Sequence, residues 1–253
     1  MPDVPVPEWL TSVPIAHRGL HDLAAGRPEN SLAAFEAAAG AGYPCELDVQ
    51  LTDGGELVVL HDFGLRRATG VDRPAATLTA AELPGLRLFG TDQRIPTLAQ
   101  VIDVVAGRIP LQVEIKRAPG DDPRTLAGAV LAALERGQAD CAVSSFDPFV
   151  VYRLRAARPR YAIGQISGLL REQPLPKRLA GRYMAGNFVT RPDFISYELA
   201  GVRSGVVRAA RRGGVPVLAW GVRSPADEAR ARQHADNVIF DDYRPALSAP
   251  GRG

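Results

Sequence analysis

Short apolar runs of strand type alternate with helical patterns along most of this chain. Helical patterns separate most of these runs, which cover residues 13–19, 45–51, 56–62, 111–116, 141–146, 161–166, 194–197, 215–220 and 237–240. Continuous apolar strands that alternate with helices are typical of a parallel sheet covered by helices. Because about eight such units close into a barrel, the sequence predicts an α/β fold of the (β/α)8 TIM-barrel class.

An open, doubly wound parallel sheet is the alternative architecture. It usually shows a glycine-rich phosphate-binding turn after its first strand, and none follows residues 13–19. The length of 253 residues suits one large barrel, so we expect residues 1–253 to form a single domain. Residues 63–95 have no long hydrophobic period and predict a small insertion of loops and short helices after the second strand.

The run 45–51 carries two carboxylates where a core strand is normally apolar. Side chains alternate along a strand, so Glu46 and Asp48 share one face and the apolar residues share the other. Two neighbouring carboxylates repel and resist joint ionisation. A bound cation is the commonest reason to keep such a pair, and oxygen ligands suit Mg²⁺ or Ca²⁺.

The run 111–116 repeats this pattern. Glu114 lies on its polar face and is a candidate third ligand, and Lys116 lies one pleat further along the same face. The chain uses 28 Arg but only two Lys, so a Lys facing carboxylates is a candidate for a role that needs a compact ammonium. The alternative is that Lys116 has no special role and is one of two Lys that the sequence retains by chance.

Two histidines end strand-type runs beside charged residues. His17 and Arg18 close the first run, and His61 closes the run 56–62. Two imidazoles can divide the work of base and acid near neutral pH. With a hard cation and two basic side chains to neutralise a phosphoryl group, this set of residues indicates cleavage of a phosphate ester.

Each of these residues also has a structural interpretation. A histidine at a strand end is often only hydrogen bonded, and Arg18 could simply neutralise Glu46. Trp220, at the end of the run 215–220, is a candidate wall of a ligand pocket, but it could equally pack inside the barrel.

Bulk properties exclude several other classes. The formal net charge of +2 argues against a nucleic-acid groove or a membrane-surface patch. Cys45 and Cys141 fall in apolar strands and are expected to be buried thiols, not a disulfide or a metal pair. We see no secretion signal in residues 1–12 and no transmembrane run, so a cytoplasmic protein is expected. The sequence does not indicate the oligomeric state.

An ordered series of short motifs resembles the glycerophosphodiester phosphodiesterases. The first part of the series consists of His17-Arg18-Gly19, Pro28-Glu29-Asn30-Ser31, Glu46-Leu47-Asp48-Val49, Thr52-Asp53-Gly54, His61-Asp62 and Glu114-Ile115-Lys116. Two later segments, Ser145-Phe146-Asp147-Pro148 and Val217-Leu218-Ala219-Trp220, are also similar to the family. The resemblance spans most of the chain.

This resemblance implies a TIM barrel and assigns roles to individual residues. It implies one divalent cation, Mg²⁺ or Ca²⁺, held by Glu46, Asp48 and Glu114. His17 and His61 would act as acid and base, and Arg18 and Lys116 would hold the phosphate. Glu29 and Asn30 would lie beside the site, although helix capping is the simpler interpretation of Asn30, since either Asn30 or Ser31 is expected to cap the helix that follows.

The same resemblance implies the reaction. A small-molecule glycerophosphodiester would be hydrolysed to sn-glycerol 3-phosphate and an alcohol. In the mechanism proposed for the family, the glycerol 2-hydroxyl attacks phosphorus and water then opens the cyclic phosphate. Residues 221–223 and 240–243 depart from the family pattern, so the sequence does not specify the alcohol.

Two other functions remain open. A lysophospholipase D-like phosphodiesterase would need an apolar groove at the rim, which residues 63–95 and 169–190 do not clearly supply. A catalytically silent barrel that binds a phosphorylated metabolite is the second alternative, and it would usually have lost one of the histidines or ligands that are all present here.

Overall fold

The structure, a computed structural model, describes residues 4–171 and 173–247. Contacts along the chain divide it into two compact units. We call Ala16–Cys141 the N-terminal unit, and Met1–Ile15 together with Ala142–Gly253 the C-terminal unit. Each unit is described by itself below, and the single domain expected for residues 1–253 stays a prediction.

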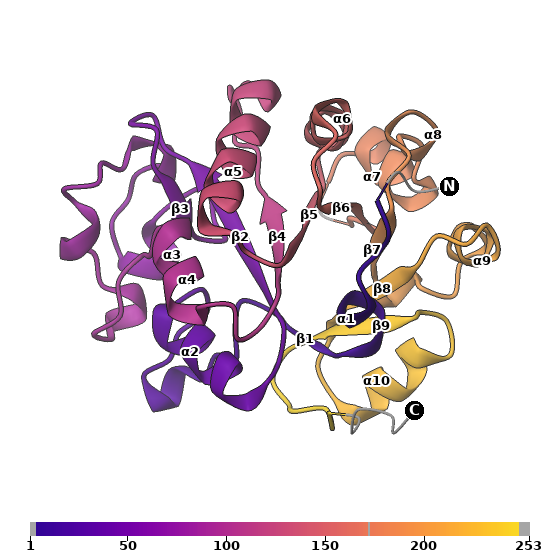
Figure 1. Cartoon of the computed structure of the whole chain (residues 1–253), viewed down its shortest axis with the longest axis horizontal. Helices are drawn as coiled ribbons and strands as arrows, with labels where there is room; N and C mark the ends of the chain where they lie inside the picture. Colours follow the sequence, from indigo (N-terminus) through magenta and orange to yellow (C-terminus); the bar gives the residue numbers. More distant parts are fainter. Residues whose placement is uncertain (1–3, 172, 248–253) are drawn as a thin grey trace. The chain divides into compact units, whose positions relative to one another are not determined.

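The N-terminal unit is organised around strand β2 (Cys45–Leu51), seen in Figure 1. Parallel neighbours flank β2: β1 (Ile15–Ala16) pairs through Ala16 with Cys45, and β4 (Leu111–Ile115) lies on the other side. The register between β2 and β4 sets Asp48 opposite Glu114. Since facing residues in adjacent strands point to the same side of a sheet, this register brings carboxylates from two strands together.

Helices cover these strands, and their ends follow the capping signals of the sequence. They are α2 (Leu32–Ala41), α4 (Leu98–Val105) and α5 (Pro123–Gly137), with a short 3₁₀ turn, η1 (Leu23–Ala25), before α2. The Ser31 hydroxyl accepts the Ala34 N–H at the start of α2, and the Asp122 carboxylate caps α5. Thr97 and Gln100 form a reciprocal capping box at the start of α4.

The run 56–62 departs from the alternation of parallel strands. Only β3 (Leu57–Val59) is a strand there, and it pairs antiparallel with the end of β2 as a hairpin. The following segment contains α3 (Arg66–Thr69), η2 (Ala75–Thr77), η3 (Leu83–Gly85) and η4 (Leu88–Gly90). It has its own buried apolar cluster, which includes Leu65, Leu78 and Leu88, and so matches the predicted insertion of loops and short helices.

The C-terminal unit contains consecutive parallel strands. They are β5 (Cys141–Ser145), β6 (Ala162–Ser167), β7 (Phe194–Glu198), β8 (Val217–Val222) and β9 (Asn237–Phe240), and from β5 to β9 each pairs with the next. The helical elements of this unit are α1 (Glu8–Ser12), α6 (Pro148–Ala157), α7 (Leu175–Tyr183), α8 (Asn187–Thr190), η5 (Leu199–Gly201), α9 (Gly205–Arg212) and α10 (Pro225–Arg232).

Helix α1 closes the amino end of this sheet. Leu10 is buried with Ile15 and Phe194, and the Asn237 amide donates hydrogen bonds to the Leu10 carbonyl at 2.9 Å and the Val13 carbonyl at 2.6 Å. Residues 169–190, ambiguous from sequence, contain α7 and α8. No helix within the described ranges is long and apolar enough to cross a bilayer, and both cysteines are buried free thiols, as expected.

Candidate active site

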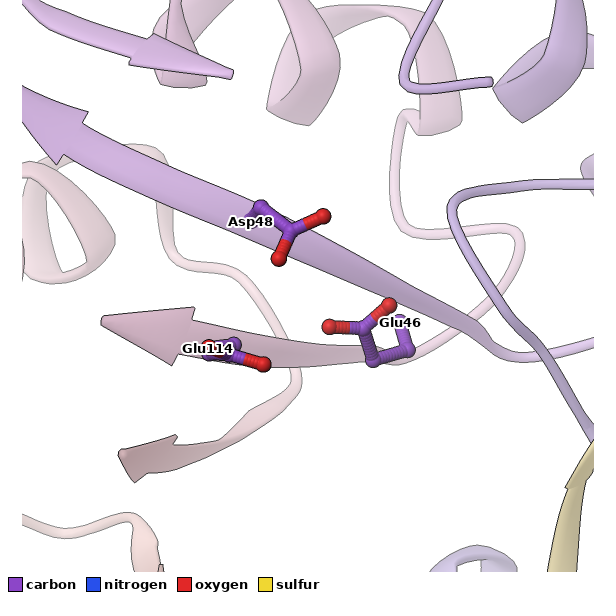
Figure 2. A group of neighbouring side chains, drawn as sticks. All are labelled: Glu46, Asp48 and Glu114. Atoms are coloured by element: carbon purple, nitrogen blue, oxygen red, sulfur yellow. The ribbon is translucent and has the colours of Figure 1, made fainter. Parts of the chain in front are cut away.

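Three buried carboxylates gather on strands β2 and β4. Glu46 and Asp48 come from β2 and Glu114 from β4, and one oxygen of each lies within 4.8 Å of the others. Figure 2 shows the three side chains on the same side of the two strands. The alternation read from the sequence therefore places all three candidate ligands around one point.

The pKa values of the three carboxylates shift in different directions because their surroundings differ. Burial raises the pKa of Glu46 well above its usual range, and the Asp48 and Glu114 carboxylates raise it further. Burial likewise raises the pKa of Glu114. Burial also acts on Asp48, but the Lys116 and Arg18 cations outweigh it and hold the pKa of Asp48 below its usual range. The cluster thus holds more carboxylate than its own cations can neutralise.

Asn30 fixes the orientation of Asp48. Its amide nitrogen donates to Asp48 Oδ2 at 2.8 Å, and Arg18 Nε lies 3.3 Å from the same oxygen. Asp48 Oδ1 is buried and accepts no hydrogen bond from the described residues, although the Lys116 ammonium lies 3.4 Å away as an ion-pair partner. Asn30 itself has a positive φ of 56°, which Asn tolerates better than most residues. Because Ser31 caps the helix, the capping role predicted for Asn30 is wrong.

The Lys116 ammonium lies between a carboxylate of β2 and a carboxylate of β4. The ammonium is 3.3 Å from Glu114 Oε1 and 3.4 Å from Asp48 Oδ1, and it lies over the Phe63 ring at 5.8 Å. Burial disfavours its charge, but the Glu114 and Asp48 carboxylates outweigh burial and raise the pKa of Lys116. The ammonium therefore stays charged inside the cluster.

The turn after β1 brings His17 and Arg18 to the carboxylates. The Arg18 N–H donates to Glu46 Oε2 at 3.3 Å, and His17 Nε2 lies 3.8 Å from the same oxygen. Arg18 has a φ of 57° and the next residue, Gly19, a φ of 81°. A Cβ on Gly19 would come within 2.9 Å of the Ala34 backbone, so this close turn requires glycine.

His61 is linked to the insertion through Asp62 and Arg67. His61 Nδ1 lies 2.7 Å from Asp62 Oδ1, and Arg67 Nε donates to Asp62 Oδ2 at 2.6 Å. Burial opposes ionisation of Asp62, but hydrogen bonds from Arg67 and His61 outweigh it and lower the pKa of Asp62 to about 2. An ionised carboxylate only accepts, so Nδ1 carries the hydrogen and Nε2 is left to exchange protons.

Arg67 also binds the residue that holds Arg18. Its guanidinium donates to Glu29 at 2.7 Å, and Glu29 accepts from Arg18 at 2.8 Å. Arg67 lies over the Phe89 ring at 5.3 Å. These contacts link the insertion to Arg18, a predicted phosphate ligand, and to His61, a predicted acid–base residue. The sequence analysis missed Arg67, since no local pattern shows that a residue of α3 reaches Glu29 and Asp62.

Trp220 belongs to the C-terminal unit. Its indole N–H donates to the Ser167 carbonyl at 3.0 Å, and its ring meets Phe146 edge to face at 5.9 Å between centroids. The ring is half-buried, and Trp220 lies two residues before the carboxyl end of β8. The structure thus brings seven of the eight predicted site residues together within the N-terminal unit, and the role of Trp220 stays a prediction. The seven are His17, Arg18, Glu46, Asp48, His61, Glu114 and Lys116.

Comparison with known proteins identifies a family and related chains. The profile of the Glycerophosphoryl diester phosphodiesterase family matches residues 17–244. A glycerophosphodiester phosphodiesterase of Caldanaerobacter subterraneus is 27% identical over 259 residues, which cover 96% of this chain and 100% of that protein. A lysophospholipase D of Rattus norvegicus is 35% identical over 116 residues, which cover 40% of this chain and 35% of that protein.

Solved structures extend the likeness to the fold. A glycerophosphodiester phosphodiesterase from Thermotoga maritima superposes with a TM-score of 0.69 at 27% identity, covering 90% of this chain and 94% of that one. The predicted (β/α)8 barrel and the predicted enzyme class, a phosphoric diester hydrolase, are confirmed. Because the family profile matches most of the sequence, the chain belongs to the glycerophosphoryl diester phosphodiesterase family.

Proposed function

We propose that this chain is a metal-dependent phosphodiesterase that hydrolyses glycerophosphodiesters to sn-glycerol 3-phosphate and an alcohol, with His17 and His61 as acid and base. The observation that carries the proposal is the convergence of Glu46, Asp48 and Glu114 with their oxygens within 4.8 Å of one another. Buried carboxylates this close are costly unless a cation neutralises them.

The residues present fit a divalent cation. Three carboxylate oxygens are the hard ligands that Mg²⁺ and Ca²⁺ prefer. The buried Asp48 Oδ1, which accepts no hydrogen bond from the described residues, has a lone pair available for an ion. The bound ion would neutralise the phosphoryl oxygens as charge develops on them. Both ions suit an all-oxygen site, and the experiment below distinguishes them.

Arg18 and Lys116 would hold the phosphate. Arg18 is anchored by Glu29 and Lys116 by Glu114, so each cation is oriented before the substrate arrives. Preoriented charges stabilise a transition state without reorganising during the reaction. Glu29 and Asn30 would be positioning residues that do not touch the substrate. Glu29 orients Arg18, and Asn30 orients Asp48.

The two imidazoles would move the protons. Burial lowers the pKa of His61, which favours its neutral form near pH 7, and we assign it the base that takes the proton of the glycerol 2-hydroxyl. That oxygen bonds to phosphorus as the bond to the alcohol breaks, and His17 protonates the departing alcohol. The roles reverse when water opens the cyclic phosphate to give sn-glycerol 3-phosphate.

The test is turnover of a panel of glycerophosphodiesters by the chain after chelation and after addition of Mg²⁺ or Ca²⁺. We expect chelation to abolish release of sn-glycerol 3-phosphate, and one of the ions to restore it. Glu114→Gln should lose turnover, whereas Glu36→Gln, which removes an exposed carboxylate paired with Arg108, should keep it. Full turnover in the chelated chain would contradict the proposal.

Lysophospholipids are a second candidate class of substrate. The partial match to a rat lysophospholipase D, over 40% of this chain, favours including them. Lysolipids therefore belong in the same panel, with release of lysophosphatidic acid as the readout. The panel also tests the silent-barrel alternative, since such a protein would bind glycerophosphocholine without releasing choline.

A further inference from the structure

Helix α7 in the C-terminal unit exposes apolar side chains that no core covers. None of its residues from Leu175 to Tyr183 is buried, and Leu175, Leu179 and Tyr183 are 62%, 45% and 56% exposed. A surface helix normally buries its apolar stripe against the protein. A contiguous apolar stripe that stays exposed marks an interaction surface.

The anchoring of α7 explains why this stripe faces away from the protein. The three apolar side chains recur every fourth residue and share one face, and Gly181 lies on the opposite face. The Gly181 carbonyl accepts a hydrogen bond from Ser167 Oγ at 2.5 Å, and a Cβ at Gly181 would meet the Leu170 side chain at 2.5 Å. The helix is therefore held by its Gly181 face.

The apolar surface continues into α8. Phe188 is 86% exposed, the highest value for a large apolar residue in the described part of the chain, and Val189 is also exposed. We call the following residues the α7–α8 surface: Leu175, Leu179, Tyr183, Phe188 and Val189.

The charged residues within the segment that carries this surface are all basic. Residues 173–191 contain four basic residues, Lys177, Arg178, Arg182 and Arg191, and no Asp or Glu. All four basic side chains are exposed. The net charge of +2 averages out this local excess, which is why the whole-chain charge argued against a membrane-surface patch.

Exposed apolar and aromatic residues among cations match the surface of an anionic bilayer. Amphipathic helices of this kind bury their apolar face at the headgroup boundary while their cations attract anionic lipids. A second copy of this chain is a poorer occupant, because two surfaces with the same excess of cations would repel each other.

We propose that the α7–α8 surface docks on the headgroup layer of an anionic phospholipid bilayer. The helix lies at the carboxyl ends of its neighbouring strands: Ser167 ends β6, and the hydroxyl of Tyr197 in β7 donates to the Arg182 carbonyl at 2.8 Å. Docking concentrates the chain on a bilayer that contains lysophospholipids, a consequence that rests on the proposed function.

Cosedimentation of the full chain with vesicles tests the docking itself. We expect at least about tenfold more bound chain on equimolar phosphatidylcholine and phosphatidylglycerol than on phosphatidylcholine alone, and loss of this difference at high salt. Phe188→Ser with Val189→Ser should lower binding about tenfold, since both side chains leave the apolar surface. Lys177→Gln with Arg178→Gln should remove the preference for the anionic vesicles.

Matched controls remove similar groups elsewhere. Leu23→Ser removes an exposed leucine of the N-terminal unit, and Arg208→Gln with Arg212→Gln removes two exposed cations of α9; both controls should bind as the unchanged chain does. Binding to neither vesicle, or undiminished binding by the Phe188 and Val189 variant, overturns the proposal. A dimer in sedimentation analysis that this variant dissociates also overturns it, because a second copy would then cover the surface.

Turnover separates this proposal from the proposed function. The Phe188→Ser, Val189→Ser variant should hydrolyse a water-soluble glycerophosphodiester at the unchanged rate but release product from vesicle-borne lysophospholipid about tenfold more slowly. Vesicle binding without turnover of either substrate would contradict the proposed function and leave the docking supported. Turnover of both substrates at unchanged rates would overturn the docking alone.

Discussion

Strands β2 and β4 bury carboxylates besides the amides of Gln50 and Gln112, whereas strands β5 to β9 bury no Asp or Glu. In the N-terminal unit, β2 and β4 bury Glu46, Asp48 and Glu114 with too few cations to neutralise them. In the C-terminal unit, the buried Gln165 and Asn237 amides donate to backbone carbonyls of their own unit. Neutral amides with backbone partners stabilise a fold, whereas clustered carboxylates destabilise it until a ligand arrives. We therefore expect the chemistry in the N-terminal unit.

Replacing an imidazole in either unit tests this division most strongly. We expect His17→Ala or His61→Ala to lower turnover of glycerophosphocholine about a thousandfold, because each removes a group that moves a proton. His234→Ala, in the C-terminal unit, should leave turnover unchanged. Initial rates with all three purified variants measure the difference, and substantial turnover in either of the first two would remove the assigned acid–base pair.

Arg67 tests whether the insertion positions the catalytic residues. Arg67→Ala breaks the contacts to Asp62 and Glu29, so His61 and Arg18 lose their orientation and kcat should fall about tenfold. Arg67→Lys should recover part of the loss. The matched control is Arg73→Ala, which removes a cation that pairs with Glu82 within the same insertion; an equal fall in this control would mean that the insertion matters only for folding.

Replacing Asn237 tests whether the buried amides of the C-terminal unit serve stability and not turnover. Asn237→Leu removes the amide that binds the Leu10 and Val13 carbonyls and leaves both without that donor. The free energy of unfolding should fall by about 1–3 kcal/mol, while kcat of the folded enzyme should not change. Urea denaturation and steady-state rates on the same preparation measure both; a lower kcat with unchanged stability would place chemistry in the C-terminal unit.

The lowered pKa of Asp62 leads us to expect a small dependence of the free energy of unfolding on pH. Its pKa of about 2 lies below the usual value of about 3.9, so the unfolded chain binds more protons between these values. Asp62 thus contributes stability above about pH 4 that is lost as the pH falls toward 2. Asp62→Asn should flatten the dependence of unfolding free energy on pH in this window. Asp92→Asn, an exposed variant of the same segment, is the control and should keep the original slope.

Much of the site follows from local rules that a sequence displays. Strand alternation placed Glu46 and Asp48 on one face of their strand and Glu114 and Lys116 on one face of theirs. The register between β2 and β4, which the sequence does not show, brings the two faces together. Capping residues marked the start of α5 and of other helices because their side chains satisfy local N–H groups. Such interactions lie within a few residues along the chain, so periodicity and spacing contain them.

The remaining features depend on contacts distant in sequence. The position of Asn30 before a helical pattern suggests a cap, whereas its hydrogen bond to Asp48 spans eighteen residues and leaves no local signal. Arg67 likewise reaches Glu29 across thirty-eight residues. Residues 169–190 were ambiguous because α7 packs through Gly181 and leaves its apolar side chains exposed, the reverse of the usual amphipathic pattern. Tertiary contacts decide these cases, and no local pattern records them.

The central claim is that a divalent cation held by Glu46, Asp48 and Glu114 is required for turnover. Its most direct measurement is the rate of glycerophosphocholine hydrolysis as Mg²⁺ or Ca²⁺ is added stepwise to the chelated chain. Our account predicts no hydrolysis before addition, recovery along a one-site binding curve, and a much weaker curve for Glu114→Gln. Hydrolysis at the full rate in the chelated chain, or an unchanged curve for Glu114→Gln, would contradict it.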